Sequence, residues 1–143
     1  MRRIALMVFR LFFKAFYYFS HIWWCSIHDN ISYEEGFRWC KKTTLAANRA
    51  GRVTIEAHGV ENLPEKDGFI MFPNHQGLFD GLVFLESCPK VFSFVMKKEA
   101  ANVILLKQVR KALGALVIDR EDLRQSMKVC LLYTSDAADD LLC

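Results

Sequence analysis

The chain lacks the cysteine spacing of a metal site or a disulfide framework. Its five cysteines are odd in number and scattered, and no Cys-x-x-Cys pair or Cys/His cluster is present. These absences argue against a structural zinc site and favour a reduced, cytosolic environment. No internal repeat is visible either. The 143 residues are enough for one domain with a hydrophobic core and too few for two comfortable ones.

Basic residues are missing from the end of the chain. All 19 Lys and Arg residues lie at or before Lys128, whereas Asp136, Asp139 and Asp140 lie in the final segment. With only the 13 other acids the net charge would be +6 rather than +3. A moderately basic body suits an anionic membrane surface or a phosphate-bearing substrate. Ordinary solvated surface charge explains this excess of basic residues equally well.

The most apolar stretch of the chain comes first. Hydrophobic residues make up 52% of the sequence and mean hydropathy is +0.11, which is high for a soluble domain. Residues 4–27 are apolar and aromatic apart from Arg10, Lys14, Ser20, His21 and Ser26. As a helix rising about 1.5 Å per residue, this run would extend roughly 36 Å, enough to span or deeply enter a bilayer.

The polar positions of this first helix form a stripe. At about 100° per residue they fall within about 20° of one line. The stripe consists of Arg3, Arg10, Lys14, His21 and His28. We therefore expect an interfacial or steeply embedded anchor, with Arg3, Arg10, Lys14, Trp23 and Trp24 as its membrane residues. The stripe would face the headgroups, water or the catalytic domain.

Other interpretations of the first helix stay open. A single transmembrane span is one, since Met1-Arg2-Arg3 would favour a cytoplasmic N-terminus. A cleaved signal peptide fits less well, because the apolar stretch is too long and Cys25-Ser26-Ile27 is a poor cleavage site. A buried core helix fits least, because of its two internal cations.

A second helix is expected from Ser32 to about Ala50. Ser-Tyr-Glu-Glu fits a capping box with Glu35 at the third helical position, and Gly51 is a typical stop. The basic residues of this helix lie on or near one side, which suits either a membrane surface or solvent. We expect residues 1–50 to form a membrane-associated helical region on the cytoplasmic face.

Beyond Gly51 the pattern becomes one of alternating strands and helices. Strands are expected at 53–57, 69–72, 91–96 and 115–118, and helices at 78–86, 99–113 and 121–132. Such alternation predicts an α/β fold with a mixed, mainly parallel sheet flanked by helices. The pattern does not determine the order of the strands. We assign this domain to residues 51–129.

The heptapeptide 74–80, Asn-His-Gln-Gly-Leu-Phe-Asp, places a histidine and a carboxylate at a strand-to-helix turn. His75 is suited to act as a base near neutral pH, and Asp80 can fix its tautomer. A structural interpretation is also available, with Gly77 as the helix N-cap and Asp80 stabilised by the helix dipole. A metal-dependent hydrolase is a further alternative, but His58 is not a convincing third ligand.

The His-x4-Asp spacing resembles the motif of the 1-acylglycerol-3-phosphate acyltransferase (PlsC-type) family of glycerolipid acyltransferases. Residues 60–64, Val-Glu-Asn-Leu-Pro, are similar to the family's G-x-E-N-[IL]-P connector. Lys97-Lys98-Glu99 resembles its K-x-E segment. Residues 114–120, Gly-Ala-Leu-Val-Ile-Asp-Arg, resemble its second block. These matches occur in the right order and cover roughly residues 52–128.

The resemblance implies transfer of a fatty acyl group from acyl-CoA or acyl-carrier protein to the free hydroxyl of lysophosphatidic acid. His75 would be the general base and Asp80 its orienting partner, with no cofactor, metal or nucleic acid. Because the base acts directly on the acceptor alcohol, no nucleophilic serine is required. The backbone N–H groups of Gln76 and Gly77 are oxyanion candidates, and Asn74 would help to hold the turn.

The resemblance also implies an acceptor site. Arg120 would bind the glycerol phosphate, because a guanidinium matches phosphate geometry in a bidentate manner. The other substrate-binding candidates are Gly114, Lys97 and Lys98. The two lysines would contact phosphates of the acyl donor or of the acceptor, and a simple surface role suits at least one of them better. An ion pair of Arg120 with a neighbouring acid, Asp119, Glu121 or Asp122, explains that residue equally well.

Two departures from the family pattern stand out. Gly77 occupies a position that is usually Ser or Thr. From Cys130 the sequence matches nothing expected, and a Glu-Gly-Thr-Arg-like phosphate-binding loop is missing. We therefore expect residues 130–143 to be a non-native tail on a truncated reading frame, and the chain to be weak or inactive. The alternatives are an enzyme acting on another glycerolipid or lysolipid acceptor, and a non-catalytic membrane-binding fragment.

Overall fold

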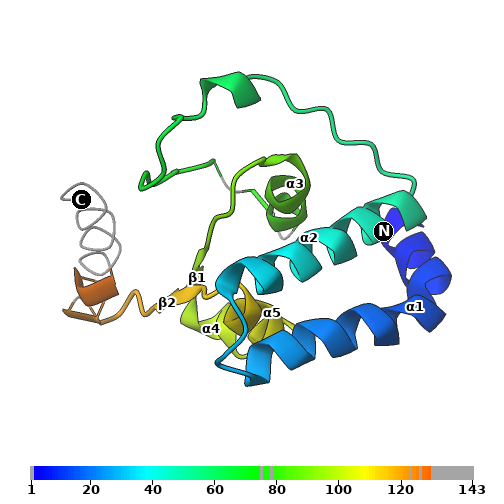
Figure 1. The fold of residues 1–143 in the computed structure, drawn as a ribbon, viewed down its shortest axis with the longest axis horizontal. Helices are drawn as coiled ribbons and strands as arrows, with labels where there is room; N and C mark the ends of the chain where they lie inside the picture. Colours follow the sequence, from blue (N-terminus) through cyan, green and yellow to red (C-terminus); the bar gives the residue numbers. More distant parts are fainter. Residues whose placement is uncertain (1, 75, 78, 123, 126, 130–143) are drawn as a thin grey trace.

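The computed structural model describes residues 2–74, 76–77, 79–122, 124–125 and 127–129 (Figure 1). The elements are α1 Arg2–Ile27, α2 Tyr33–Ala50, the 3-10 turn η1 Val60–Asn62, α3 Asp80–Ser87, β1 Val95–Lys97, α4 Lys98–Ala101, α5 Leu106–Ala112 and β2 Leu116–Ile118. The described residues between 124 and 129 are also helical. The expected tail, 130–143, lies outside the described residues.

The two predicted N-terminal helices form, and they lie side by side (Figure 1). Arg3 donates from Nη1 to the carbonyl oxygen of Gly51 at 3.2 Å and also to that of Arg52. Arg10 donates to the carbonyl oxygen of Ala50 at 3.3 Å. The start of α1 therefore lies at the end of α2, and the two helices are antiparallel. Both cations bind carbonyls that have no partner within α2, at the negative end of its dipole.

Both predicted ends of α2 are confirmed. The Ser32 side chain accepts from the Glu35 amide at 3.3 Å, which satisfies a donor left open by the helix start. The Glu35 carboxylate is engaged by Trp39 and Arg38 on the same helix. At the other end the Gly51 amide bonds back to the carbonyl of Ala47 at 2.9 Å.

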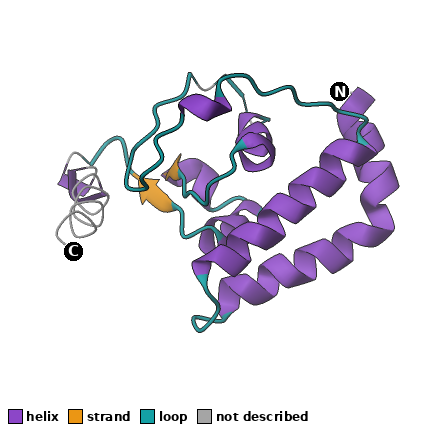
Figure 2. Cartoon of the chain, turned by 45° about the horizontal axis from the view of Figure 1, so that its top comes forward, coloured by secondary structure: helices purple, strands orange, loops and turns teal. Residues whose placement is uncertain are grey.

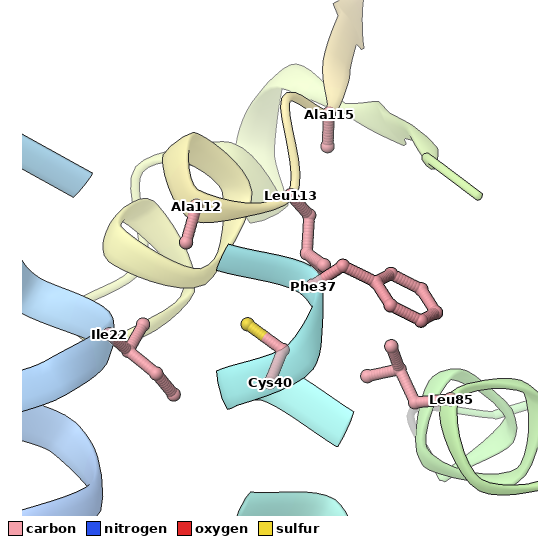
Figure 3. Close-up of a cluster of buried hydrophobic side chains, with 7 residues drawn as sticks. All are labelled: Ile22, Phe37, Cys40, Leu85, Ala112, Leu113 and Ala115. Atoms are coloured by element: carbon pink, nitrogen blue, oxygen red, sulfur yellow. The ribbon is translucent and has the colours of Figure 1, made fainter. Parts of the chain in front are cut away.

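The hydrophobic core lies where α1, α2, α3 and α5 meet (Figure 3). Its buried members are Ile22, Phe37, Cys40, Leu85, Ala112, Leu113 and Ala115. A glycine permits the close approach of α2 to α5. A Cβ added at Gly36 would lie 2.1 Å from the carbonyl oxygen of Ala112, a separation that no side chain could keep.

The sheet of the described residues is a parallel pair, β1 with β2. Val95 pairs with Leu116, Met96 with Val117 and Lys97 with Ile118. The prediction of parallel pairing is confirmed for these two strands, which are joined through α4 and α5. Because parallel strands run the same way, the residues that follow Lys97 and Ile118 emerge at one edge.

The predicted strands at 53–57 and 69–72 are wrong. Both segments lack regular secondary structure and join no ladder, and among the described residues of the long connection from α2 to α3, η1 is the only regular element (Figure 2). The segment 69–72 was expected to be buried on both faces, yet Phe72 is 89% exposed. An apolar run becomes a buried strand only when neighbouring strands pair with it, and among the described residues β1 and β2 pair only with each other.

The helix expected over 99–113 is divided in two. α4 ends at Ala101 and α5 begins at Leu106. Leu105 has a φ of 75°, a conformation that ends a helix, and the preceding Val103 and Ile104 are β-branched residues of low helix propensity. The helix expected from Leu78 begins two residues later, at Asp80.

The first helix exposes an aromatic face. Its most exposed members are Phe9 at 82%, Phe13 at 90% and Phe16 at 84%. Among the described residues, no helix combines the length and the apolar character needed to cross a membrane.

Candidate active site

The carboxylate of the His-x4-Asp motif holds the turn that precedes α3. Asp80 is the first residue of α3, and its Oδ2 accepts from the backbone N–H of Gln76 at 2.7 Å and of Gly77 at 3.0 Å. The Asp80 amide in turn donates to the Gly77 carbonyl at 3.1 Å. The turn is thus closed by three hydrogen bonds between its two sides. His75 and Leu78 lie outside the described residues.

The structural interpretation of Asp80 as a third-position helix acid does not match this geometry. Phe79 is the N-cap and makes no side-chain capping bond. The Asp80 side chain reaches back to amides that come before the helix, so it organises the loop that carries the motif. A carboxylate at the first helical turn is also favoured by the helix dipole.

The two oxyanion candidates are the same amides that Asp80 engages. An acyl carbonyl oxygen at this turn would share these donors with the carboxylate, or take them from it. Asn74 lies just before them and is exposed. The oxyanion role of Gln76 and Gly77 and the turn-holding role of Asn74 stay predictions.

Gly77 does not need to be glycine for steric reasons. A Cβ built on Gly77 would have no atom within 4 Å. A serine or threonine, the residues usual at this position in the resembled family, would fit without displacing a neighbour.

The second group of candidates gathers at the edge where β1 and β2 end. Lys98 donates from Nζ to Oδ2 of Asp119 at 2.9 Å, which joins the residues that follow the two strands. This hydrogen bond lowers the pKa of the Asp119 carboxyl and raises the pKa of the Lys98 ammonium. Lys97 and Arg120 are exposed at the same edge. Asp119, offered as an ion-pair partner for Arg120, is bonded to Lys98.

Gly114 has a conformational reason for its identity. It connects α5 to β2 with a φ of 55°, and an added Cβ would lie 3.1 Å from a ring carbon of Tyr33. Glycine adopts such backbone angles at little cost. Its predicted part in substrate binding stays a prediction beside this structural role.

Gln125 belongs to the edge as well, and no sequence pattern singles it out. Its carboxamide oxygen accepts from the Asp119 amide at 2.9 Å, and its Nε2 donates to the Val117 carbonyl at 2.7 Å. A glutamine seven residues beyond a strand is too common to be singled out by pattern.

The predicted membrane residues of α1 have divided roles. Arg3 and Arg10 bind the end of α2, while Trp23 and Trp24 are half exposed. Lys14 is exposed. Another member of the stripe, His21, packs on Trp39 of α2 with ring centroids 3.8 Å apart. The stripe therefore faces α2 at several points, a partner that sequence periodicity could not identify.

No group of three or more His, Cys, Asp or Glu side chains within the described ranges could hold a metal ion. The metal-hydrolase alternative therefore gains no support from this part of the chain.

Comparison with protein families identifies the class. Residues 54–137 match the model of the acyltransferase family. The match includes the His-x4-Asp turn, both strands and the edge that carries Arg120, and it covers more than half of the chain. The chain belongs to the acyltransferase family, the glycerolipid acyltransferases. Searches of curated proteins and of solved structures give no match.

Proposed function

We propose that the chain transfers a fatty acyl group from acyl-CoA or acyl-carrier protein to the free hydroxyl of lysophosphatidic acid. Membership of the acyltransferase family supports acyl transfer. The structural observation that carries the proposal is the bonding of Asp80 to the two amides that follow His75. This bonding bends the motif, so that the Asp80 carboxylate lies beside the segment that bears His75, the proposed base.

In this mechanism His75 takes the proton of the acceptor hydroxyl as its oxygen attacks the thioester carbonyl. The tetrahedral intermediate collapses by breaking the carbon–sulfur bond, and the imidazolium returns the proton to the departing thiolate. Asp80 orients the imidazole and stabilises its charged form. The backbone amides at 76 and 77 are candidates for stabilising the oxyanion.

The acceptor phosphate is proposed to bind at the strand edge. Arg120 is exposed there, and Lys97 adds a second exposed cation. Lys98 is paired with Asp119, so its first role is to join the two strand ends. Arginine suits this site because its planar donors match two phosphate oxygens at once.

Association with the cytoplasmic face of a membrane is part of the proposal. The aromatic face of α1 supports it, since exposed phenylalanines on one helix suit the headgroup boundary of a bilayer. The same face favours the second candidate, a membrane-binding module without catalysis. An acyltransferase acting on another lysolipid acceptor is the alternative within the enzyme class.

A thioester-release assay on the protein separates these candidates. His75→Ala should abolish release of the thiol while membrane association is retained, and Gly77→Ser should keep activity because that side chain has room. Near-normal turnover by His75→Ala would refute the base assignment. Loss of activity on adding a chelator would favour the metal hydrolase instead.

A further inference from the structure

The turn that follows β2 is held by side chains on both of its flanks. Asp119 bonds Lys98 through Oδ2 at 2.9 Å and the Glu121 amide through Oδ1 at 3.1 Å. Its own amide donates to Gln125 Oε1 at 2.9 Å. Gln125 Nε2 donates to the Val117 carbonyl at 2.7 Å. These bonds fix the backbone on either side of Arg120.

The Gln125 carboxamide takes the place of a neighbouring strand. It donates to residue 117 and accepts from residue 119, the alternating pattern by which a strand edge is paired. Its side chain is half-buried, so these bonds are partly shielded from water. Gln125 is itself anchored, because its backbone N–H donates to Asp122 Oδ1 at 3.0 Å.

Arg120 lies between these fixed points and is exposed. A ligand that binds an arginine on a loose loop must order the loop as well as the side chain, which weakens binding. We propose that Gln125 is a positioning residue, which fixes the turn 119–122 so that Arg120 is presented to the acceptor phosphate. The inference rests on the proposed function, since it takes Arg120 as the phosphate ligand.

The test uses the full chain, glycerol 3-phosphate as the probe, and NMR titration. Gln125→Met keeps the length of the side chain and removes both carboxamide bonds. The matched control is Val129→Ala, which changes a buried residue in the described helical segment 127–129 and whose apolar side chain makes no hydrogen bond to the turn. Arg120→Gln removes the proposed ligand. Each variant is measured for Kd, for hydrogen exchange of the Asp119 amide and for Tm.

Gln125→Met should raise the Kd for glycerol 3-phosphate about 3–10-fold. The reason is that the turn 119–122 would then have to be ordered when the ligand binds, at a cost in binding free energy. Gln125→Met should also speed exchange of the Asp119 amide. Val129→Ala should lower Tm while changing the Kd less than twofold, about the limit of such a measurement. Arg120→Gln should weaken binding more than either.

Each other outcome overturns a defined part of the account. If Arg120→Gln weakens binding and Gln125→Met does not, the positioning role is wrong and the acceptor assignment stands. If Val129→Ala raises the Kd as much as Gln125→Met, Gln125 serves stability alone. If the wild type does not bind glycerol 3-phosphate, or Arg120→Gln binds as well as the wild type, the acceptor assignment fails and the positioning role with it.

Discussion

At the residue scale, Asp80 has two separable tasks. Its Oδ2 holds the turn through two amides, and its charge is proposed to support the base. Asparagine keeps an oxygen that can accept from both amides but loses the charge, whereas alanine loses both. The pair of substitutions therefore separates the shape of the turn from its electrostatics.

We expect Asp80→Ala to speed hydrogen exchange of the Gln76 and Gly77 amides and to lower stability by about 1 kcal/mol. Asp80→Asn should leave exchange close to wild type yet reduce acyl transfer by on the order of 10²–10⁴-fold. Exchange measured by NMR and turnover measured by thiol release check the two effects. Full activity in Asp80→Asn would show that the charge is not needed.

The Lys98–Asp119 pair predicts a pH dependence of stability. The pair lowers the pKa of Asp119. The stability that the pair contributes is therefore present above the ordinary aspartate pKa of 3.8 and is lost as pH falls through the lowered pKa. The pair also raises the pKa of Lys98. At basic pH its contribution to stability is therefore lost only as pH rises through the raised pKa, above the ordinary lysine value of 10.5. The Tm difference between wild type and Asp119→Asn, measured from pH 2 to 11, should narrow toward both extremes. A constant Tm difference across this range would contradict the prediction.

Cys40 should be an unreactive thiol. Burial, with a smaller contribution from nearby Cys25, raises its pKa to about 12. At pH 8 the thiolate fraction is then very small, and the thiolate is the reactive form. Alkylation followed by peptide mass spectrometry should find Cys40 unmodified in the folded chain and modified in denaturant. Rapid labelling of the native protein would contradict this packing.

At the scale of elements, the contact between α2 and α5 depends on Gly36. An added methyl group would collide with the Ala112 carbonyl, which is backbone and cannot rotate away. We expect Gly36→Ala to destabilise the fold by about 1–3 kcal/mol, the usual cost of overpacking. Gly81→Ala is the matched control, because its Cβ meets no atom within 4 Å and alanine favours helix. Denaturant unfolding measures both, and equal stabilities would contradict the close approach.

Local signals predicted some of these elements well, and long-range pairing explains the failures. The ends of α2 were predictable because Ser32 and Gly51 act on their own helix. The segment 69–72 was wrongly taken as a buried strand, since its pattern shows apolar character but not whether a partner strand lies beside it. At the candidate site, Asp80 was found by its motif, whereas Gln125 acts through contacts that no motif records.

At the scale of the whole molecule, the basic stripe of α1 turns toward α2 and leaves the aromatic face outward. Arg3 and Arg10 are engaged by the end of α2. Binding to a membrane should therefore depend more on the aromatic face than on these cations. This division predicts a weak dependence on salt, since salt screens the attraction between charges and not the burial of apolar area.

We expect Phe13→Ser to weaken binding to anionic phospholipid vesicles by on the order of 10-fold, from the apolar area it removes. Phe72→Ser is the control, because Phe72 is 89% exposed, like Phe13 at 90%, but lies outside α1. Vesicle co-sedimentation at low and high salt measures both. Equal losses for the two variants would contradict a specific role for the α1 face.

The central claim is acyl transfer to lysophosphatidic acid by a base at residue 75. The most direct measurement is mass spectrometry of the lipid products after the protein is incubated with acyl-CoA and lysophosphatidic acid. The account predicts phosphatidic acid carrying the donor's acyl chain, formed by wild type and Gly77→Ser and missing with His75→Ala. Phosphatidic acid formed equally by His75→Ala, or free fatty acid as the only product of the wild type, would contradict it.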